Sequence, residues 1–177
     1  MRNFLHTSFP FVHQHDSMQC GVACLAMICQ HLGKNYTSTD LSPYCHPTRE
    51  GVSMLGIAEA AKAIGLHTMA GKITMQQLQA APLPCIIHWN QNHFVVLYKV
   101  AENHFYLADP AIGHVKYALD EFERYWTTTP EKGVGKGVAM FFEVTALFGT
   151  IDVHKNRKSS SLQLISIEPV LLRPIKF

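Results

Sequence analysis

The 177-residue chain is 47% hydrophobic, so one domain can bury its own core without a disulfide framework. Its formal net charge is +2 and its densest basic run is the short stretch 154–158, which argues against nucleic acid as the main partner. The five cysteines lack disulfide-scaffold spacing, Met1–Pro10 does not read as a secretory signal, and no apolar run reaches the ~20 residues that span a bilayer. These features predict reduced thiols in a cytoplasmic setting.

The first predicted element is a helix from Cys20 to Leu32, in which apolar residues recur at helical spacing. Gly33 follows it where a C-cap glycine belongs, and Asp16 or Ser17 is placed to cap its start. Cys20 is therefore expected near the N-terminus of a helix.

Two more helices are expected before the pattern changes to short β-branched and aromatic runs. One is short and follows Thr37 or Ser38, and the other runs from Ser53 to about Ile64 and is closed by Gly65. The later predicted elements are a strand at Leu66–Lys72, a helical turn at Thr74–Gln79, strands at Pro84–Trp89, His93–Val100, His104–Asp109 and His114–Tyr117, a helix at Leu119–Trp126 and a strand at Gly137–Val144. Helices followed by an antiparallel meander predict an α+β fold.

The periodic pattern weakens from about Ala146. We therefore expect one domain at residues 1–145 and a linker or tail at residues 146–177, where Pro169 and Pro174 interrupt any long helix.

Cys20 is the first residue with a chemical role to consider. A thiolate is the attacking form of cysteine, and a helix N-terminus favours an anion because its N–H groups are unpaired. Gly21 follows, and we expect its lack of a side chain to let a substrate backbone approach the sulfur. On position alone, an inert buried cysteine is the commoner reading.

A base for such a thiol must come from elsewhere in the chain. His93 begins an apolar strand after a polar turn, and Asp109 ends the next strand. In an antiparallel hairpin the start of one strand lies beside the end of the next, so Asp109 is expected to lie next to His93 and orient its ring. The ordinary alternatives are a surface histidine in a turn and an aspartate that initiates a turn before Pro110.

Gln14 lies six residues before Cys20. Its side-chain amide, with the backbone N–H of Cys20, is a candidate oxyanion hole for a tetrahedral intermediate. A lone glutamine would carry no such meaning, so the interpretation depends on its spacing to the cysteine.

Together these segments resemble the double-glycine leader peptidases, which are papain-like domains usually found at the N-terminus of bacterial bacteriocin- and peptide-exporting ABC transporters. The resemblance covers roughly Phe9 to Val144. It is carried by the blocks at 14–27, Gly51–Ser53, Leu83–Trp89, Asn92–Leu97, Ala108–Gly113 and Phe122–Trp126.

The resemblance implies a papain-like α+β fold and a cysteine endopeptidase with Cys20, His93 and Asp109 at the catalytic positions and Gln14 at the oxyanion hole. It implies no cofactor or metal. The implied substrate is a precursor peptide whose amphipathic helical leader docks in an apolar groove and is removed after a Gly-Gly-type pair. The implied partners are the membrane and ATP-binding domains of a transporter, on the cytoplasmic side of the bacterial inner membrane.

The chain itself shows no membrane span and no phosphate-binding loop. We therefore expect a fragment of such a transporter, whose residues from Ser159 onward lead toward a first membrane helix, with a free-standing cytoplasmic peptidase as the alternative.

Three alternatives compete with the leader peptidase. Structural zinc is disfavoured because none of the cysteines and histidines shows a paired CxxC or HExxH spacing. A non-catalytic docking domain is disfavoured because Cys20, His93 and Asp109 are all retained. A papain-like hydrolase or transferase acting on another acyl group remains the third alternative, and the spacing from Gln14 to Cys20 favours the leader peptidase over it.

Overall fold

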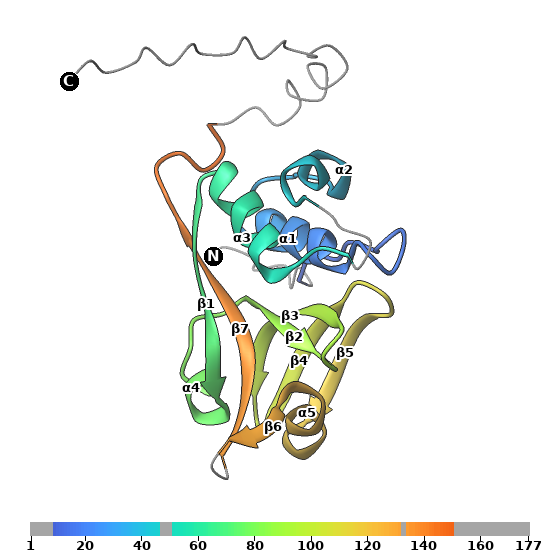
Figure 1. The fold of residues 1–177 in the computed structure, drawn as a ribbon, viewed down its shortest axis with the longest axis vertical. Helices are drawn as coiled ribbons and strands as arrows, with labels where there is room; N and C mark the ends of the chain where they lie inside the picture. Colours follow the sequence, from blue (N-terminus) through green and yellow to red (C-terminus); the bar gives the residue numbers. More distant parts are fainter. Residues whose placement is uncertain (1–8, 47–50, 132–133, 151–177) are drawn as a thin grey trace, which may run out of the picture.

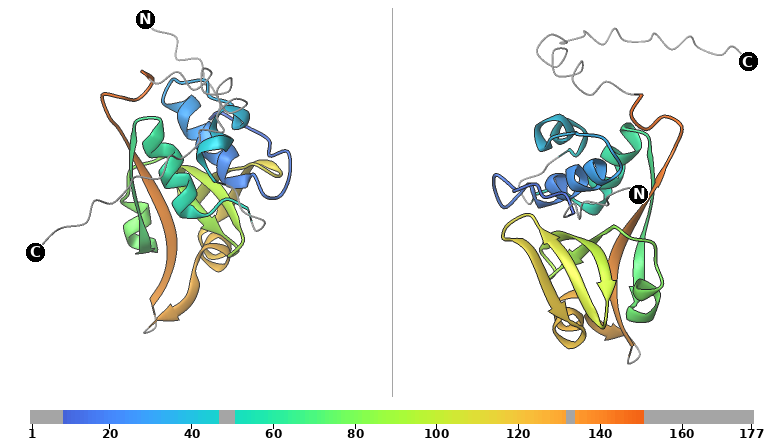
Figure 2. Two further views of the ribbon diagram at one scale, coloured as in Figure 1. Left: turned by 45° about the horizontal axis from the view of Figure 1, so that its top comes forward. Right: turned by 180° about the vertical axis from the view of Figure 1, so that it is seen from behind.

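The computed structural model describes residues 9–46, 51–131 and 134–150. Its helices and strands separate into two halves, with α1, α2 and α3 gathered at one end and most of the sheet at the other (Figure 1). The strands β1 and β7 run the length of the molecule and connect the two halves (Figure 2). The α+β fold class predicted from the sequence is confirmed.

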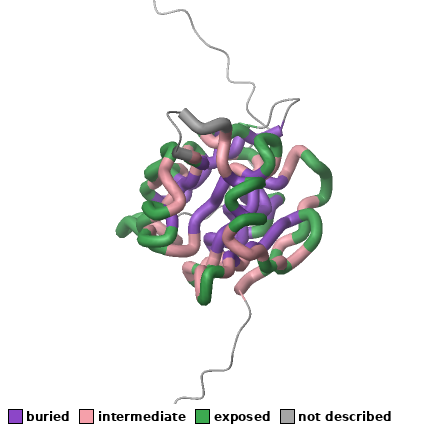
Figure 3. Tube along the Cα trace, turned by 90° about the horizontal axis from the view of Figure 1, so that it is seen from below, coloured by how far each residue is buried: buried purple, intermediate pink, exposed green. Residues whose placement is uncertain are grey.

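The helical half is organised around a central, almost completely buried helix. All residues of α1 from Cys20 to Cys29 are buried, and His31 in its last turn is exposed. Figure 3 shows that the buried segments gather in the interior of the molecule, with exposed segments around them. Gly33 follows α1 with a φ of +85°, as expected of a glycine that ends a helix. The helices of this half are α1 (Cys20–His31), α2 (Ser38–Leu41), the short 3₁₀ helix η1 (Ser42–Tyr44) and α3 (Met54–Ala63).

The sheet has seven antiparallel strands in the order β1-β7-β2-β3-β4-β5, with β6 pairing to β7. The consecutive pairing of β2, β3, β4 and β5 is the meander that the sequence predicted. The strands are β1 (Leu66–Thr74), β2 (Cys85–Trp89), β3 (His93–Ala101), β4 (His104–Asp109), β5 (Gly113–Ala118), β6 (Thr128–Glu131) and β7 (Val134–Val144).

The last strand of the described residues, β7, lies inside the sheet and not at its edge. β7 pairs with β1 along the whole length of β1, from Leu66 opposite Val144 to Thr74 opposite Lys136. On its other side it pairs with β2, with Ile86 opposite Met140. This order was not visible in the sequence, because β1 and β7 are separated by most of the sheet.

The two faces of the sheet carry separate apolar cores. One core joins α1 and α3 to residues such as Ile86, Val96 and Met140. The other lies beneath α4 (Met75–Gln79) and α5 (Leu119–Trp126), where Phe122 stacks on Phe105 with ring centroids 4.0 Å apart. The sheet is thus covered on both faces, and the helical core holds α1 against the strands β2 and β3.

Residues 145–150 turn back onto the helical half. The hydroxyl of Thr145 donates to the carbonyl of Gly65 at 2.6 Å, and Phe148 packs against the core around α1. The boundary at residue 145 stays a prediction, and most of the predicted tail, residues 151–177, lies outside the described residues. Within the described ranges, no helix is long and apolar enough to cross a membrane.

Candidate active site

Cys20 is the first residue of α1, at the end of the helix that faces the sheet half. It is 5% exposed, so its sulfur meets solvent only through the cleft described below. The unpaired N–H groups of the first helical turn favour a negative charge at this position. The predicted place of Cys20 at a helix start is confirmed.

The cap expected at this helix start is wrong. The residue that precedes the helix is Gln19, and its side chain makes no capping hydrogen bond. Asp16 instead holds the preceding loop together: it accepts from the backbone N–H of Met18 at 2.8 Å and from the Gln19 side chain at 2.7 Å. The helix begins here because its residues pack on all sides into the core, and a side-chain cap is not needed.

Gly21 also has a different role from the one expected. A Cβ atom on Gly21 would lie 2.8 Å from Cδ1 of Ile57 and 3.4 Å from Cδ2 of Phe94. The missing side chain therefore faces the interior, where it lets α1 approach α3 and β3. The glycine thus helps to position Cys20 by close packing.

The structure brings His93 and Asp109 together. His93 is the first residue of β3 and Asp109 the last of β4, and Nε2 of His93 lies 2.8 Å from Oδ1 of Asp109. The same carboxylate oxygen accepts the backbone N–H of Ala111 at 2.9 Å. Because Asp109 is 6% exposed, this carboxylate is fixed in place, and it directs Nδ1 of the ring away from itself.

The ionisation of His93 links it to both neighbours. Burial of the ring alone would lower its pKa, but hydrogen bonds to Asp109 and Cys20, and the negative charges on those two groups, raise the pKa to about 9. The imidazole is therefore held as the protonated form at neutral pH. An imidazolium beside a cysteine favours the thiolate of that cysteine.

Gln14 contacts the chain at the end of β4, where Asp109 lies. Its backbone N–H donates to the carbonyl of Pro110, the residue after Asp109, at 2.9 Å. Its side-chain oxygen is buried and has no hydrogen-bond partner among the described residues. The loop before α1 and the end of β4 thus meet at Gln14, which brings this residue to the part of the site that contains Asp109.

A cleft of about 530 Å³ opens onto Cys20. Bulky apolar side chains narrow it, among them those of Met18, Met54 and Phe94. Its other lining residues are Ser17, Gly51, Val52, Ser53, His88, Gln91, Asn92 and Val138. The cleft lies between the helical half and the sheet, with one wall from the start of α3 and the other from the ends of β2 and β3.

His88 is the residue of this cleft whose place the sequence analysis missed. It lies opposite Phe94 in the β2–β3 pair, with ring centroids 5.2 Å apart. Burial, followed by the charge on His93, lowers its pKa, so it is neutral beside a protonated neighbour. The alternation along β2 was the available signal, since it predicts that His88 shares a sheet face with Ile86, the face that α1 covers.

The other four cysteines are buried and free. Burial raises the pKa of Cys29 and of Cys45 to about 12, and it raises the pKa of Cys24 and Cys85 as well. These thiols therefore stay protonated at neutral pH. In the part of the chain that the structure describes, no group of three or more His, Cys, Asp or Glu residues is arranged to hold a metal ion.

Residues 8–130 match the peptidase C39 family. The chain belongs to this family. A probable microcin-H47 secretion/processing ATP-binding protein of Escherichia coli is 40% identical over 118 residues, which are 67% of this chain and 17% of that protein. A colicin V secretion/processing ATP-binding protein of the same species is 39% identical over 118 residues, again 67% and 17% of the two chains. The chain thus spans about a sixth of the length of these C39 relatives.

Solved structures of C39 peptidases share the fold. A double glycine motif protease from an AMS/PCAT transporter, in complex with its leader peptide, matches with a TM-score of 0.70 and 32% identity, covering 78% of this chain and 93% of that one. The peptidase domain of Streptococcus ComA, a bi-functional ABC transporter, matches with a TM-score of 0.68 and 27% identity, covering 78% and 100%. The papain-like α+β fold and the resemblance to the double-glycine leader peptidases are both confirmed.

Proposed function

We propose that this C39 domain is a cysteine endopeptidase that removes the leader of secreted bacteriocin-like peptides after a Gly-Gly-type pair. The observation that carries the proposal is the contact of His93 with Asp109 at 2.8 Å, together with the interaction of the same ring with Cys20 at the start of a buried helix. The cleavage is coupled to export by ABC transporter membrane and ATP-binding domains, on the cytoplasmic side of the bacterial membrane.

In the proposed reaction the Cys20 thiolate attacks the carbonyl carbon of the second glycine. Gln14 and the backbone N–H of Cys20 donate to the oxyanion, a type of contact worth about 3 kcal/mol per donor. Protonated His93 then gives its proton to the leaving amine, and the thioester forms. A water molecule gives a proton to His93 and hydrolyses the thioester, which releases the leader acid and restores the Cys20 thiolate beside a protonated ring. Asp109 orients His93 throughout.

The shape of the cleft supports a preference for small residues before the cut bond. Met18, Met54 and Phe94 line the approach to Cys20, so a substrate with bulky side chains at these positions would have to displace them. Two residues without large side chains fit this space without such a cost.

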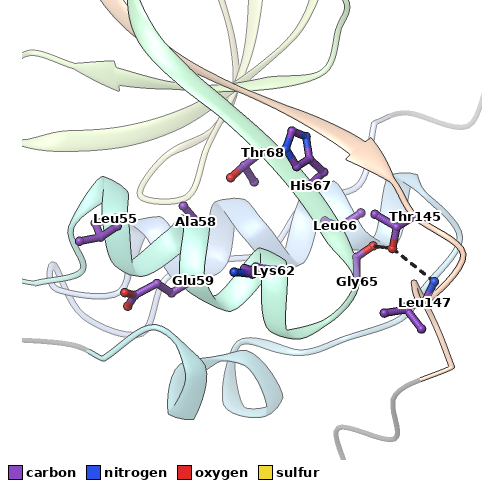
Figure 4. Close-up of a pocket in the computed structure, with 10 residues that line it drawn as sticks. All are labelled: Leu55, Ala58, Glu59, Lys62, Gly65, Leu66, His67, Thr68, Thr145 and Leu147. Atoms are coloured by element: carbon purple, nitrogen blue, oxygen red, sulfur yellow. Dashed lines mark hydrogen bonds between the residues drawn. The ribbon is translucent and has the colours of Figure 1, made fainter.

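A second hollow, of about 630 Å³, supports the binding of a helical leader (Figure 4). One wall is a stripe of α3 at helical spacing, made by Leu55, Ala58, Glu59 and Lys62, and the other comes from the start of β1 and from residues 145–147. We name this hollow the α3 groove.

Helix α3 connects the α3 groove to the cleft. Met54, its first residue, lines the cleft, and the next residue, Leu55, lines the groove. At 1.5 Å per residue, the distance along α3 from Met54 to Lys62 is about 12 Å, or some eight residues of a parallel helix. A leader helix in the groove would thus end beside Cys20 and deliver its last two residues to the cleft.

The first test uses a synthetic precursor with an amphipathic helical leader that ends in Gly-Gly. The wild-type chain should cut after the second glycine, and Cys20→Ala should lose at least about 10⁴-fold in kcat with leader affinity within about twofold. Cleavage by Cys20→Ala at the wild-type rate would overturn the assignment. Binding without any cleavage by the wild type would identify the non-catalytic docking domain instead.

The second test concerns the α3 groove. Leu55→Asp should raise KM about tenfold with little change in kcat, because a charge in the groove opposes an apolar helix. Met69→Asp is the matched control: Met69 is 68% exposed and Leu55 67%, but Met69 does not line the groove. Equal effects of the two variants would rule out the groove as the leader site.

A further inference from the structure

Cys24 makes a hydrogen bond between the two halves of the molecule, directly beside the candidate site. Its Sγ donates to the carbonyl oxygen of Phe94 at 3.2 Å, and its side chain is fully buried. Cys24 lies one helical turn after Cys20, and Phe94 directly follows His93. The contact therefore joins the helix that carries the sulfur to the strand that carries the imidazole, one step along each from the reacting groups.

The thiol of Cys24 is suited to this contact because it stays protonated. Burial, then the charges of Cys20 and Asp109, raise its pKa well above the usual value. An S–H group is a weak donor, so the bond adds little to the stability of the whole fold. Its location gives it a geometric role: a shift of α1 along β3 would change the separation of Cys20 and His93 directly.

The packing around this bond leaves little room for adjustment. Gly21, on the turn between Cys20 and Cys24, has Ile57 and Phe94 within contact distance of its missing Cβ. Phe94 also belongs to the core shared by α1 and α3. Since side chains fill this interface, the Cys24–Phe94 bond is the directional contact that sets how α1 sits on β3 beside Cys20.

We propose that Cys24 is a positioning residue, whose hydrogen bond to the carbonyl of Phe94 sets the distance between Cys20 and His93 and so the turnover of the peptidase. This inference rests on the proposed function, which supplies the reaction whose rate it explains. Cys24 touches no reacting atom. It acts by fixing the position of α1 relative to β3.

The test compares three variants of the whole chain. Cys24→Ala removes the donor and should lower kcat for the Gly-Gly precursor about tenfold with KM within about twofold, since small misplacements of reacting groups cost up to ~10²-fold. Cys24→Ser keeps a donor and should recover kcat to within about threefold of wild type. The matched control is Cys29→Ala, which removes an equally buried thiol farther along the same helix.

A second readout needs no peptide. In wild type the pKa of His93 lies at about 9, in part because of its hydrogen bond to Cys20. NMR titration of the His93 ring should show a lower pKa in Cys24→Ala, and a pKa near that of wild type in Cys24→Ser and Cys29→Ala. A purely structural loss would lower the melting temperature in both alanine variants without moving this pKa.

The outcomes separate the two proposals. Failure of the wild type to cut any Gly-Gly precursor contradicts the proposed function, whereas an unchanged kcat and His93 pKa in Cys24→Ala contradict the role of Cys24. An equal loss of kcat in Cys29→Ala contradicts it too, as does a folded Cys24→Ser variant no more active than Cys24→Ala. If Cys24→Ala does not fold, Cys24→Val fills the space without donating and takes its place in each comparison.

Discussion

The sheet side and the helix side of the candidate site are held in place by different forces. On the sheet side, one carboxylate oxygen of Asp109 accepts hydrogen bonds from the His93 ring at 2.8 Å and from the backbone N–H of Ala111 at 2.9 Å. On the helix side, Cys20 starts a helix without any side-chain cap, and the packing around Gly21 fixes its position. The sheet side therefore fixes the orientation of the His93 ring, whereas packing, together with the single hydrogen bond from Cys24 to Phe94, fixes the distance to Cys20.

Apart from the loss of Cys20 itself, breaking the sheet side should have the largest effect. Asp109→Ala removes the partner that fixes the tautomer and the plane of His93, so kcat should fall about 10³-fold with leader affinity nearly unchanged. Asp109→Asn tests orientation against charge, because an amide keeps the shape but not the negative charge. Steady-state kinetics measures kcat of the two variants, and leader titration measures their affinity. An Asp109→Ala enzyme of normal turnover would remove the proposed role of the carboxylate.

The loop that leads into the helix side should come next. Gln14→Ala should lower kcat about 10²-fold, the cost of losing one oxyanion donor. Gln19→Ala is the control in the same loop, since the Gln19 side chain donates to Asp16 and lies outside the proposed oxyanion hole. Should both variants lose the same activity, the effect of Gln14 would lie in the loop and not in the oxyanion hole.

The pH dependence tests how closely the two sides are coupled. The pKa of His93 is raised from 6.5 to about 9, so the protonated ring favours the folded state fully below pH 6.5, and this contribution is lost as the pH rises through about 9. The proton needed by the leaving amine is lost over the same range, so kcat/KM should fall about tenfold per pH unit above it. In Asp109→Ala this fall in kcat/KM should begin at lower pH. A fall that begins at the same pH as in wild type would show that Asp109 does not hold the proton on His93.

The smallest expected effect on turnover comes from the core on the other face of the sheet, beneath α5. A Cβ atom on Gly137 would lie 2.2 Å from Cε2 of the buried Trp126, so Gly137→Ala should lower the free energy of unfolding by about 1–3 kcal/mol. Gly71→Ala in the paired strand β1 is the control, because nothing lies within 4 Å of its Cβ position. Urea unfolding and kcat are measured together, and a loss of kcat in a folded Gly137→Ala chain would show that the sheet core also sets the site geometry.

Local sequence signals accounted for much of the fold. Ser53 and Gly65 mark the ends of α3 because a serine hydroxyl accepts the N–H of Gly56 and a glycine adopts the positive φ that follows the helix. The meander from β2 to β5 could be predicted because each strand contacts its neighbour in the chain. The pairing of His93 with Asp109 follows from the same local geometry.

What the sequence did not reveal depends on distant partners. Strand β6 was missed because its four residues include Pro130, which is unusual in a strand, and it forms only through pairing with β7. The helix cap at Asp16 was predicted wrongly because the carboxylate is satisfied within its own loop. The place of His88 in the cleft required knowing that α1 covers that face of the sheet.

The position of β7 has a consequence for the order in which the site is assembled during synthesis. Cys20, His93 and Asp109 all emerge from the ribosome before Val138, which β7 contributes to the wall of the cleft. Until β7 enters between β1 and β2, the sheet lacks an interior strand and β1 is not joined to the meander. A nascent chain can thus hold Cys20, His93 and Asp109 before the wall of the cleft is complete.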